Sequence, residues 1–558
     1  MFGKKDGIIV PFIAGPTKDW VLLGSRSSFE RRYTRERLGR AGPKTPAGRV
    51  PPDPSPSQVL VSHGLVSRDV FDGGELFFRE TFTGNGRTCA TCHPVENNLV
   101  VDPAFIDTLP NDHPIFVAEE GHPNRVPNLE IPELLREFGL ILENVDGFED
   151  PVRKFTMRGV PHSLSLSTSI MPPEPDADGN LPDGSTLAFE QRTGWSGDGA
   201  PMPGTLRLFS VGAVIQHFTK DLARTPGTHF RLPTDEELDE MEAFMLTTGR
   251  TNDLDLSSVT LADARAESGR DLFMGNEAKC SVCHNNAGAN TSFAGDVNFN
   301  FDTGVEPVRI AVLNEMGIPF DGGFGGQNQA EFSFDSSGDG IPDSFGNGTF
   351  NAPPLVEAAD TGPFFHTNAF KTIEGAVAFY SSDAFNTSPA GIVAGGINLT
   401  DEQTEDVAAF LRIINAAFNY AIAIQRTEAA LRLLDPASGS PGNRVAGNSV
   451  NAQRPGPAIP GPANAGRSLV STINRLLELA NAELKDAIEV LQGGPFILND
   501  GSIQSAMEAM VLNEKAMNAK SNSTQRELVT NSLAKQMTAK EELGTGLDFV
   551  MGEGNLLF

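Results

Sequence analysis

The chain has 558 residues, of which 39% are apolar and 21% are charged, so it holds enough apolar material for the packed cores of several domains. This composition excludes a single small domain and a chain that is disordered throughout. Acidic residues outnumber basic ones by 72 to 43, and the resulting net charge of −29 would repel a phosphate backbone, which argues against nucleic acid as a partner.

Residues 1–60 are predicted to form an extended arm. Residues 1–50 hold 11 Lys or Arg against 4 Asp or Glu, so the arm is basic and is expected to be solvated, with a tether to an acidic partner surface as the alternative. Prolines are expected to exclude regular structure over its second part, at Pro43, Pro46, Pro51, Pro52, Pro54 and Pro56. No transmembrane segment is expected, and the stretch after Lys4 and Lys5 is too short and too interrupted by proline for a clear signal peptide.

All four cysteines fall into two copies of one motif. The copies are Cys89-Ala90-Thr91-Cys92-His93 and Cys280-Ser281-Val282-Cys283-His284. Cys-x-x-Cys-His is the attachment motif of c-type haem, in which two thiols one helical turn apart form thioethers to the vinyl groups and the next imidazole binds the iron. A redox dithiol or half of a zinc site would not require the histidine in both copies. The sequence therefore predicts two covalently bound haem c groups, with His93 and His284 as iron ligands.

Haem is attached to such motifs outside the cytoplasm, so a periplasmic or extracellular location is expected. Disulfides would be permitted there, but no cysteine is left to form one.

The sequence around the two motifs repeats. Upstream, Gly73-Gly74-Glu75-Leu76-Phe77 matches Gly269-Arg270-Asp271-Leu272-Phe273, and each is expected to begin a helix. Downstream, Thr234-Asp235-Glu236-Glu237 matches Thr400-Asp401-Glu402-Gln403, and each is a capping box before an apolar stripe at helical spacing. The repeat predicts two cytochrome-c-like haem domains, residues 61–255 and 256–415, each closed by a capped helix.

Residues 416–558 are predicted to form a C-terminal helical extension, interrupted by a Pro/Gly-rich linker from Asp435 to Gly466. The piece from Leu469 to Gly493 is amphipathic and ends at a glycine. We expect it to pack against the haem domains, with a protein partner as the alternative. The predicted fold class is thus mainly α: two haem domains with long loops, an N-terminal arm and a helical extension.

Taken together, three features resemble the bacterial di-haem cytochrome c peroxidase superfamily, which also includes MauG and the rubber oxygenases. They are the two haem motifs, a Trp-x-Gly-Asp-Gly segment between them at Trp195, and a Gly-Pro-Phe-Phe-His segment after the second motif that ends at His366. The resemblance covers residues 65–415 and leaves both ends of the chain unexplained.

In that family a tryptophan between the haems relays electrons, and the resemblance gives this role to Trp195. A buried structural tryptophan is the alternative. The interval of 102 residues from His93 to Trp195 is longer than in the small peroxidases, and this layout is closer to the rubber-oxygenase branch.

The second haem has a candidate outer ligand. The segment from Thr361 to His366 resembles the family segment Thr-Ala-Pro-Tyr-x-His, and fourteen residues after that histidine the peroxidases place a Met ligand and MauG a Tyr. Here this residue is Tyr380. Tyrosinate is a hard, anionic donor that favours ferric and higher iron. The resemblance therefore implies that Tyr380 is the ligand; His366 is the alternative ligand, and simple helix packing is the alternative role for Tyr380.

The chain departs from the peroxidases on the distal side of the first haem. The positions of the distal Gln and Glu, which orient peroxide and shuttle its proton, correspond to Phe209 and Lys220. A one-residue slip in this alignment would place Asp221 at the acid position. An apolar wall with Phe209 suits a pocket that handles O2 and resembles the rubber oxygenases. Gln216 and His217 lie nearby and could supply a polar group, although His217 could equally be a core or surface histidine.

A calcium ion is a further expectation of the resemblance. The family holds calcium between the haems with backbone oxygens, which correspond to Thr361 and Pro363, and with an Asn side chain, for which this chain has Gly159. Separately, the loop from Asp335 to Asp343 carries carboxylates among glycines, which suits calcium; an acidic surface turn is the alternative.

The sequence predicts a di-haem oxidoreductase that reacts with peroxide or O2 at the first haem, with the second haem storing or relaying oxidising equivalents. Its partner would be a small redox protein or an organic substrate. The competing hypothesis is an electron-transfer cytochrome or docking subunit without substrate chemistry of its own, for which the N-terminal arm and the C-terminal helices would be docking surfaces. An open coordination site on one of the irons would favour the oxidoreductase, because a pure electron carrier has both irons six-coordinate.

Overall fold

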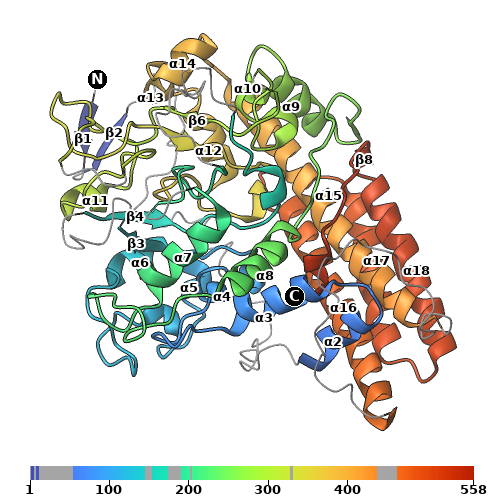
Figure 1. The fold of residues 1–558 in the computed structure, drawn as a ribbon. Helices are drawn as coiled ribbons and strands as arrows, with labels where there is room; N and C mark the ends of the chain where they lie inside the picture. The colour runs from blue at the N-terminus through green and yellow to red at the C-terminus, as the bar shows by residue number, and fades with distance from the viewer. Residues whose placement is uncertain are drawn as a thin grey trace.

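The computed structural model describes residues 2–5, 8–11, 54–144, 154–173, 190–200, 204–293, 295–326, 331–435 and 462–558. Over these residues the chain is mainly α, as the sequence predicted (Figure 1). Its short strands form two-stranded antiparallel sheets. Most of the predicted N-terminal arm and of the Pro/Gly-rich linker lies outside the described residues.

The helices fall into three groups along the chain. Those before residue 255 are α2 (Pro54–Ser62), α3 (Arg68–Arg79), α4 (Cys89–Cys92), α5 (Pro103–Ile106), α6 (Pro132–Phe138), α7 (Leu206–His217) and α8 (Asp235–Leu246). The second group is α9 (Ala264–Met274), α10 (Cys280–Cys283), α11 (Ala311–Glu315), α12 (Ile373–Phe379), α13 (Asp383–Asn386), α14 (Pro389–Ala394) and α15 (Asp401–Leu433). The last is α16 (Pro462–Gln492), α17 (Asp500–Met517) and α18 (Asn522–Glu541).

The described strands form two-stranded antiparallel sheets. The pairs are β1 (Phe2–Lys5) with β2 (Ile8–Pro11), β3 (Leu140–Glu143) with β4 (Thr156–Gly159), β5 (Thr260–Leu261) with β8 (Gly544–Thr545), and β6 (Asn300–Phe301) with β7 (Phe350–Asn351). The β5–β8 pair joins the start of the second predicted haem domain to the end of the chain.

The two haem segments are built around the same helix crossing. Helix α3 packs on α8, and α9 packs on α15. A Cβ atom on Gly73 would lie 1.9 Å from the carbonyl oxygen of Glu240, and one on Gly269 would lie 1.9 Å from that of Asp406. Only glycine therefore allows these backbones to approach. Glu240 and Asp406 each stand six residues after the capping threonine of their helix, so the crossings are equivalent.

The same equivalence holds for the aromatic contact beside each crossing. The ring centroids of Phe77 and Phe244 are 5.2 Å apart, and those of Phe273 and Phe410 are also 5.2 Å apart. Both predicted capping boxes are present, at the starts of α8 and α15. The internal repeat seen in the sequence is thus a repeat of local structure.

The predicted position of the repeated glycines within their helices was wrong. They do not begin the helices, because α3 starts after the cap Ser67 and α9 after the cap Asp263, each of whose side chains accepts a hydrogen bond from a first-turn amide. Gly73 and Gly269 lie inside the helices, where the close crossing requires them. Helix α2 also begins at Pro54, inside the proline-rich stretch, because proline is tolerated in a first helical turn.

Helix α15 is a central element of the core. It has 33 residues and continues across the predicted domain boundary at residue 415, so this boundary falls inside a helix. Within the described residues it is the one helix long and apolar enough to cross a membrane, but 94% of its apolar window is buried inside the protein. A buried core helix accounts for this composition.

The C-terminal helices pack beside α15 and form a bundle with it (Figure 1). Ile473, Leu476 and Leu484 of α16 are buried in the same apolar core as Phe77 and Phe410. Phe558 also packs near the first motif, since its ring lies 5.9 Å from Phe78 and 6.1 Å from Phe244. The extension therefore packs against the segments that carry the two Cys-x-x-Cys-His motifs.

Candidate functional site

Each haem motif forms one turn of helix with its histidine as the C-terminal cap. The motif helices are α4 and α10, and the backbone N–H groups of His93 and His284 donate to Cys89 and Cys280 at 3.0 and 2.9 Å. The φ and ψ angles are −116° and 64° at His93, and −121° and 63° at His284. Two sites with the same local geometry are thus present in one chain.

The histidine rings are held in the same way. His93 Nδ1 lies 2.9 Å from the Leu99 carbonyl oxygen, and His284 Nδ1 lies 3.0 Å from the Pro353 carbonyl oxygen. A carbonyl partner fixes the proton on Nδ1 and leaves Nε2 with the lone pair that binds a metal. Burial lowers the pKa of both rings, that of His284 to about 4, so both are neutral at pH 7.

The four thiols are unpaired. Burial raises the pKa of Cys89, Cys280 and Cys283 to about 12, and that of Cys92 to about 11, so all four are protonated at neutral pH. In each motif two free thiols one turn apart precede a neutral imidazole whose Nε2 has no hydrogen-bond partner among the described residues. These residues fit covalent haem c. No group of three or more metal-binding side chains occurs in the described part of the chain.

A buried charged group adjoins the first motif. Arg87 lies two residues before Cys89, is 1% exposed, and its Nη1 is 2.8 Å from Glu130 Oε1. His217, at the end of α7, has its Nδ1 4.0 Å from the same carboxylate oxygen. Burial lowers the pKa of His217 well below its ordinary value, and the neighbouring Arg87, Arg224 and His93 lower it further. His217 is therefore a neutral imidazole in the surroundings of His93.

The other residues expected on the distal side lie on α7 or directly after it. Gln216 is buried and its Nε2 donates to the Leu142 carbonyl at 3.0 Å, while its Oε1 has no hydrogen-bond partner within the described structure. Phe209 packs on Gly194, where an added Cβ would lie 3.2 Å from its ring. Lys220 and Asp221 are exposed, and Asp221 accepts from the Ala223 amide. Neither residue supplies a buried acid.

Trp195 is anchored by hydrogen bonds to segments on either side of it in the sequence. Its Nε1 donates to the Gly159 carbonyl at 2.7 Å, and its own carbonyl accepts from Asn351 at 2.8 Å. The Gly159 amide in turn donates to the His366 carbonyl at 2.7 Å. Phe209 and Trp195 are therefore neighbours through the Gly194 turn, which the sequence did not predict.

Tyr380 and His366 have different surroundings. Burial raises the pKa of Tyr380, and the nearby thiols of Cys283 and Cys280 raise it further, so its hydroxyl lies in the neighbourhood of the second motif. His366 instead stacks on Phe350 with ring centroids 4.1 Å apart. Its Nε2 lies 3.3 Å from Glu306 Oε2, so this nitrogen faces a carboxylate.

Sequence reasoning missed a histidine near the first motif. His162 is among the groups that lower the pKa of His93, and its own pKa is lowered by desolvation. Its Nδ1 is buried and has no hydrogen-bond partner among the described residues. No motif marks His162.

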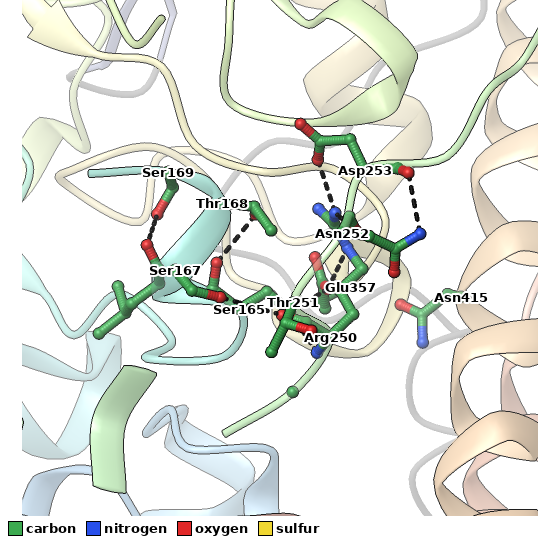
Figure 2. A network of polar contacts seen from close by, with 12 residues as sticks. Ser165, Ser167, Thr168, Ser169, Arg250, Thr251, Asn252, Asp253, Glu357 and Asn415 are labelled. Atoms are coloured by element: carbon green, nitrogen blue, oxygen red, sulfur yellow. Dashed lines mark hydrogen bonds and ion pairs between the residues drawn. The ribbon is translucent and has the colours of Figure 1, made fainter. Parts of the chain in front are cut away.

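The same region holds a buried ion pair (Figure 2). Arg250 Nε lies 2.9 Å from Glu357 Oε1, and both side chains are fully buried. Ser165 donates to the same Glu357 oxygen at 2.7 Å, and Arg250 Nη1 reaches Asp253 at 2.6 Å. Arg250 Nη2 and Glu357 Oε2 have no partner among the described residues. A buried donor without a partner is compatible with a further polar group bound nearby.

The structure shows the surroundings of the residues expected to hold calcium. The Thr361 hydroxyl, which is not the expected backbone ligand, donates to the Glu357 carbonyl at 2.8 Å. The space beside Gly159, where the family has an Asn side chain, holds the Asn368 amide, since a Cβ on Gly159 would lie 2.0 Å from its oxygen. In the separate acidic loop, Asp335 accepts hydrogen bonds from the amides of Gly338, Asp339 and Gly340. Calcium at Thr361 and Pro363 stays a prediction.

The comparisons with known proteins assign no family. No family model and no curated protein matches the chain. Among solved structures, a MauG-like protein associated with microbial copper homeostasis is similar at 17% identity and a TM-score of 0.33, over 62% of this chain and 88% of that one. A likeness this remote carries no argument about the function of the present chain.

Proposed function

We propose that the chain is a di-haem c-type oxidoreductase of the MauG and cytochrome c peroxidase type. The observation that carries the proposal is the pair of equivalent sites: each has two free thiols on one helical turn and a neutral histidine whose Nδ1 is held by a backbone carbonyl. When bound, the haems would supply one-electron oxidation chemistry with peroxide or O2.

At the first site, His217 is the polar side chain placed to act beside the group on His93. A neutral imidazole can hydrogen-bond to a bound oxidant or bind the iron itself. Glu130 is tied to Arg87 and is therefore less available as a proton donor. Gln216 and Phe209 would complete an enclosed, largely apolar wall, which favours reaction with O2 or with an organic substrate over rapid turnover of hydrogen peroxide.

Between the sites, Trp195 is the proposed electron relay and Tyr380 the proposed outer ligand of the second haem. Both are supported by their surroundings: Trp195 is fixed by hydrogen bonds to segments on either side of it, and, besides burial, Cys283 and Cys280 of the second motif raise the pKa of Tyr380. His366 is the weaker candidate, because its Nε2 faces Glu306. A periplasmic or extracellular location follows from covalent haem attachment.

The proposal is tested by the haem content of the purified protein. Alkaline pyridine spectra with a protein assay should return two c-type haems per chain that survive denaturation. The double variant Cys89→Ala, Cys92→Ala should retain one, and Cys280→Ala, Cys283→Ala should retain the other. Haem that is lost on a denaturing gel would contradict the proposal.

The alternative function is an electron carrier without substrate chemistry. The coordination of the irons distinguishes it from the proposed oxidoreductase. Electron paramagnetic resonance of the oxidised protein should show one high-spin and one low-spin haem if the first site is open. Two low-spin haems that bind neither cyanide nor carbon monoxide would favour the carrier.

A further inference from the structure

A single connector joins the parts of the chain that carry the two motifs. Helix α8 follows the first motif and ends at Leu246, and α9 precedes the second motif and begins at Ala264. The connector is therefore residues 247–263, within which the structure shows one short strand, β5. A connection of this kind is where a hinge is expected, because loop residues can absorb changes in backbone angle.

Residues 543–558, which we call the glycine strap, lie antiparallel along this connector. At one end β8 pairs with β5. At the other end the Gly552 amide donates to the Gly249 carbonyl at 2.9 Å, and the Gly554 amide donates to the Thr247 carbonyl at 3.0 Å. Backbone groups at both ends of the connector are thus paired with the strap.

Every glycine of the strap faces the connector at close range. A Cβ on Gly544, Gly546 or Gly552 would lie 2.2, 2.6 or 2.1 Å, respectively, from a carbonyl oxygen of the connector, and one on Gly554 would lie 2.8 Å from that of Thr247. A side chain at any of these positions would push the two backbones apart. The sequence of the strap is therefore suited to lie directly on the connector.

Asn555 adds a side-chain pairing to the same backbone. Its Oδ1 accepts from the Gly249 amide at 2.7 Å, and its Nδ2 donates to the Gly249 carbonyl at 2.9 Å. The Asn555 side chain is fully buried. Its backbone carbonyl accepts from Arg426 Nε at 2.9 Å, which ties the strap to the central helix α15.

The strap and the connector each reach the surroundings of one motif. The strap ends at the helix crossing beside the first motif, where the Phe558 ring packs 6.1 Å from Phe244 of α8. The connector reaches the second motif, where the Leu256 amide donates at 3.1 Å to the side chain of Asn286, two residues after His284. Strap and connector therefore form one paired unit that contacts both surroundings.

We propose that the glycine strap positions the two motif-carrying parts of the chain relative to each other, with Asn555 as its positioning residue. By pairing with the connector, the strap removes the hinge and so sets the separation across which an electron passes between the sites on His93 and His284. One site loses the electron that the other gains, and no bond is made or broken. This inference rests on the proposed function and gives part of the C-terminal extension a role that the family resemblance leaves open.

Three variants of the holoprotein test this role. Asn555→Ala removes both side-chain hydrogen bonds to Gly249, and Gly552→Ala separates strap and connector through a clash with the Thr247 carbonyl. Asn513→Ala is the matched control, because Asn513 is equally buried but bonds to Asn481 of α16 within the C-terminal helices.

Two measurements are made on each protein. Hydrogen exchange followed by mass spectrometry reports how often the connector amides open. Pulse radiolysis reduces one haem rapidly, and the optical spectrum then reports how fast the electron is shared with the other haem.

Asn555→Ala and Gly552→Ala should both speed amide exchange in residues 247–263. They should also lower the rate of electron transfer between the haems by roughly tenfold or more, since a displacement of about 1 Å between reacting centres can cost roughly 10²-fold in rate. The haem content and the spectrum of each haem should stay as in the parent, because neither variant changes a residue of the motifs. Asn513→Ala should leave both measurements unchanged.

Faster exchange of the connector with an unchanged transfer rate in both strap variants would overturn the positioning role. Unchanged exchange in both variants would show that the strap does not hold the connector. Equally slow transfer in Asn513→Ala would also overturn the role, because the effect would then follow a general loss of stability. Failure of the proposed function is distinguishable, since it would appear as missing covalent haem before any electron transfer is measured.

Discussion

At the scale of single residues, the structure separates side chains that local sequence can identify from those it cannot. The cysteines and histidines of both motifs, and the capping threonines, are recognised by spacing because their partners lie within a few residues. Glu130 and Glu357 carry no such signal, since their arginine partners are 43 and 107 residues away. Their pairing depends on the fold, and so the charged surroundings of both motifs were not predictable.

Replacing Tyr380 tests the proposed ligand of the second haem. Tyr380→Phe keeps the ring, which packs 5.0 Å from Phe385, but removes the hydroxyl near Cys280 and Cys283. We expect the spectrum of one haem to change and that of the other to stay as in the parent. Tyr420→Phe, a change at a buried tyrosine bonded to Ser502, is the control. If both haem spectra of Tyr380→Phe equal the parent's, Tyr380 only packs.

Peroxide turnover tests the distal side of the first haem. We expect kcat/KM for hydrogen peroxide below roughly 10⁶ M⁻¹s⁻¹, because general acid–base assistance is worth about 10²–10⁴-fold and neither Phe209 nor the exposed Lys220 supplies it. His217→Leu should alter the spectrum of one haem. Asp221→Asn should leave both spectrum and rate unchanged, because Asp221 is exposed and bonded to the Ala223 amide. Fast turnover abolished by Asp221→Asn would restore a peroxidase assignment.

At the scale of elements, the repeat could be predicted from the sequence, but the helix crossing that it forms could not. The sequence shows that a glycine precedes each motif and that a capped helix follows it. The structure adds that, in each repeat, this glycine contacts the backbone of the capped helix. Periodicity finds helices because it reports one apolar face. It does not report which two helices cross, and this is why the glycines were expected at helix starts.

Alanine at the crossing glycines tests this equivalence. A Cβ at either Gly73 or Gly269 would lie 1.9 Å from a carbonyl oxygen of the facing helix. We expect each Gly→Ala variant to lower the free energy of unfolding by about 1–3 kcal/mol or more, since backbone must move to admit it. Gly501→Ala, in α17 with its nearest neighbour at 3.5 Å, should instead be neutral or stabilising. Chemical denaturation measures all three, and an unaffected Gly269→Ala would contradict the equivalence.

At the scale of the whole molecule, α15 joins what the sequence divided. The predicted boundary at residue 415 follows the end of the sequence repeat, but α15 continues for another 18 residues, to Leu433, and carries the C-terminal bundle on the same core. The end of a sequence repeat shows where the similarity between the two copies ends. It does not show where a helix or the core that it packs in ends. The C-terminal helices are therefore part of the body that positions the second capped helix, and their docking can be probed by titrating the acids at this junction.

Acidic side chains at the junction make stability depend on pH. Burial, together with the charges of Glu483 and Asp360, raises the pKa of Asp486 on α16 to about 8. Burial likewise raises the pKa of Asp360 to about 7. The unfolded chain releases the Asp486 proton near its ordinary pKa of 3.8, whereas the folded protein keeps it until about pH 8. The contribution of this group to stability is therefore fully present below about pH 4 and is lost as the pH rises toward 8.

Asp486→Asn keeps the side chain neutral at every pH. The variant should therefore not lose stability at this position as the pH rises from 4 to 8. Parent and variant should unfold alike at pH 4, and the variant should be more stable by about 1–2 kcal/mol at pH 8, because it has no charge to bury. Asp500→Asn, at an exposed acid in α17, is the control and should show no such pH-dependent difference. Urea denaturation of the holoprotein from pH 4 to 9 measures the difference directly. A gap between parent and Asp486→Asn that is constant with pH would show that Asp486 is not buried as a neutral acid at this junction.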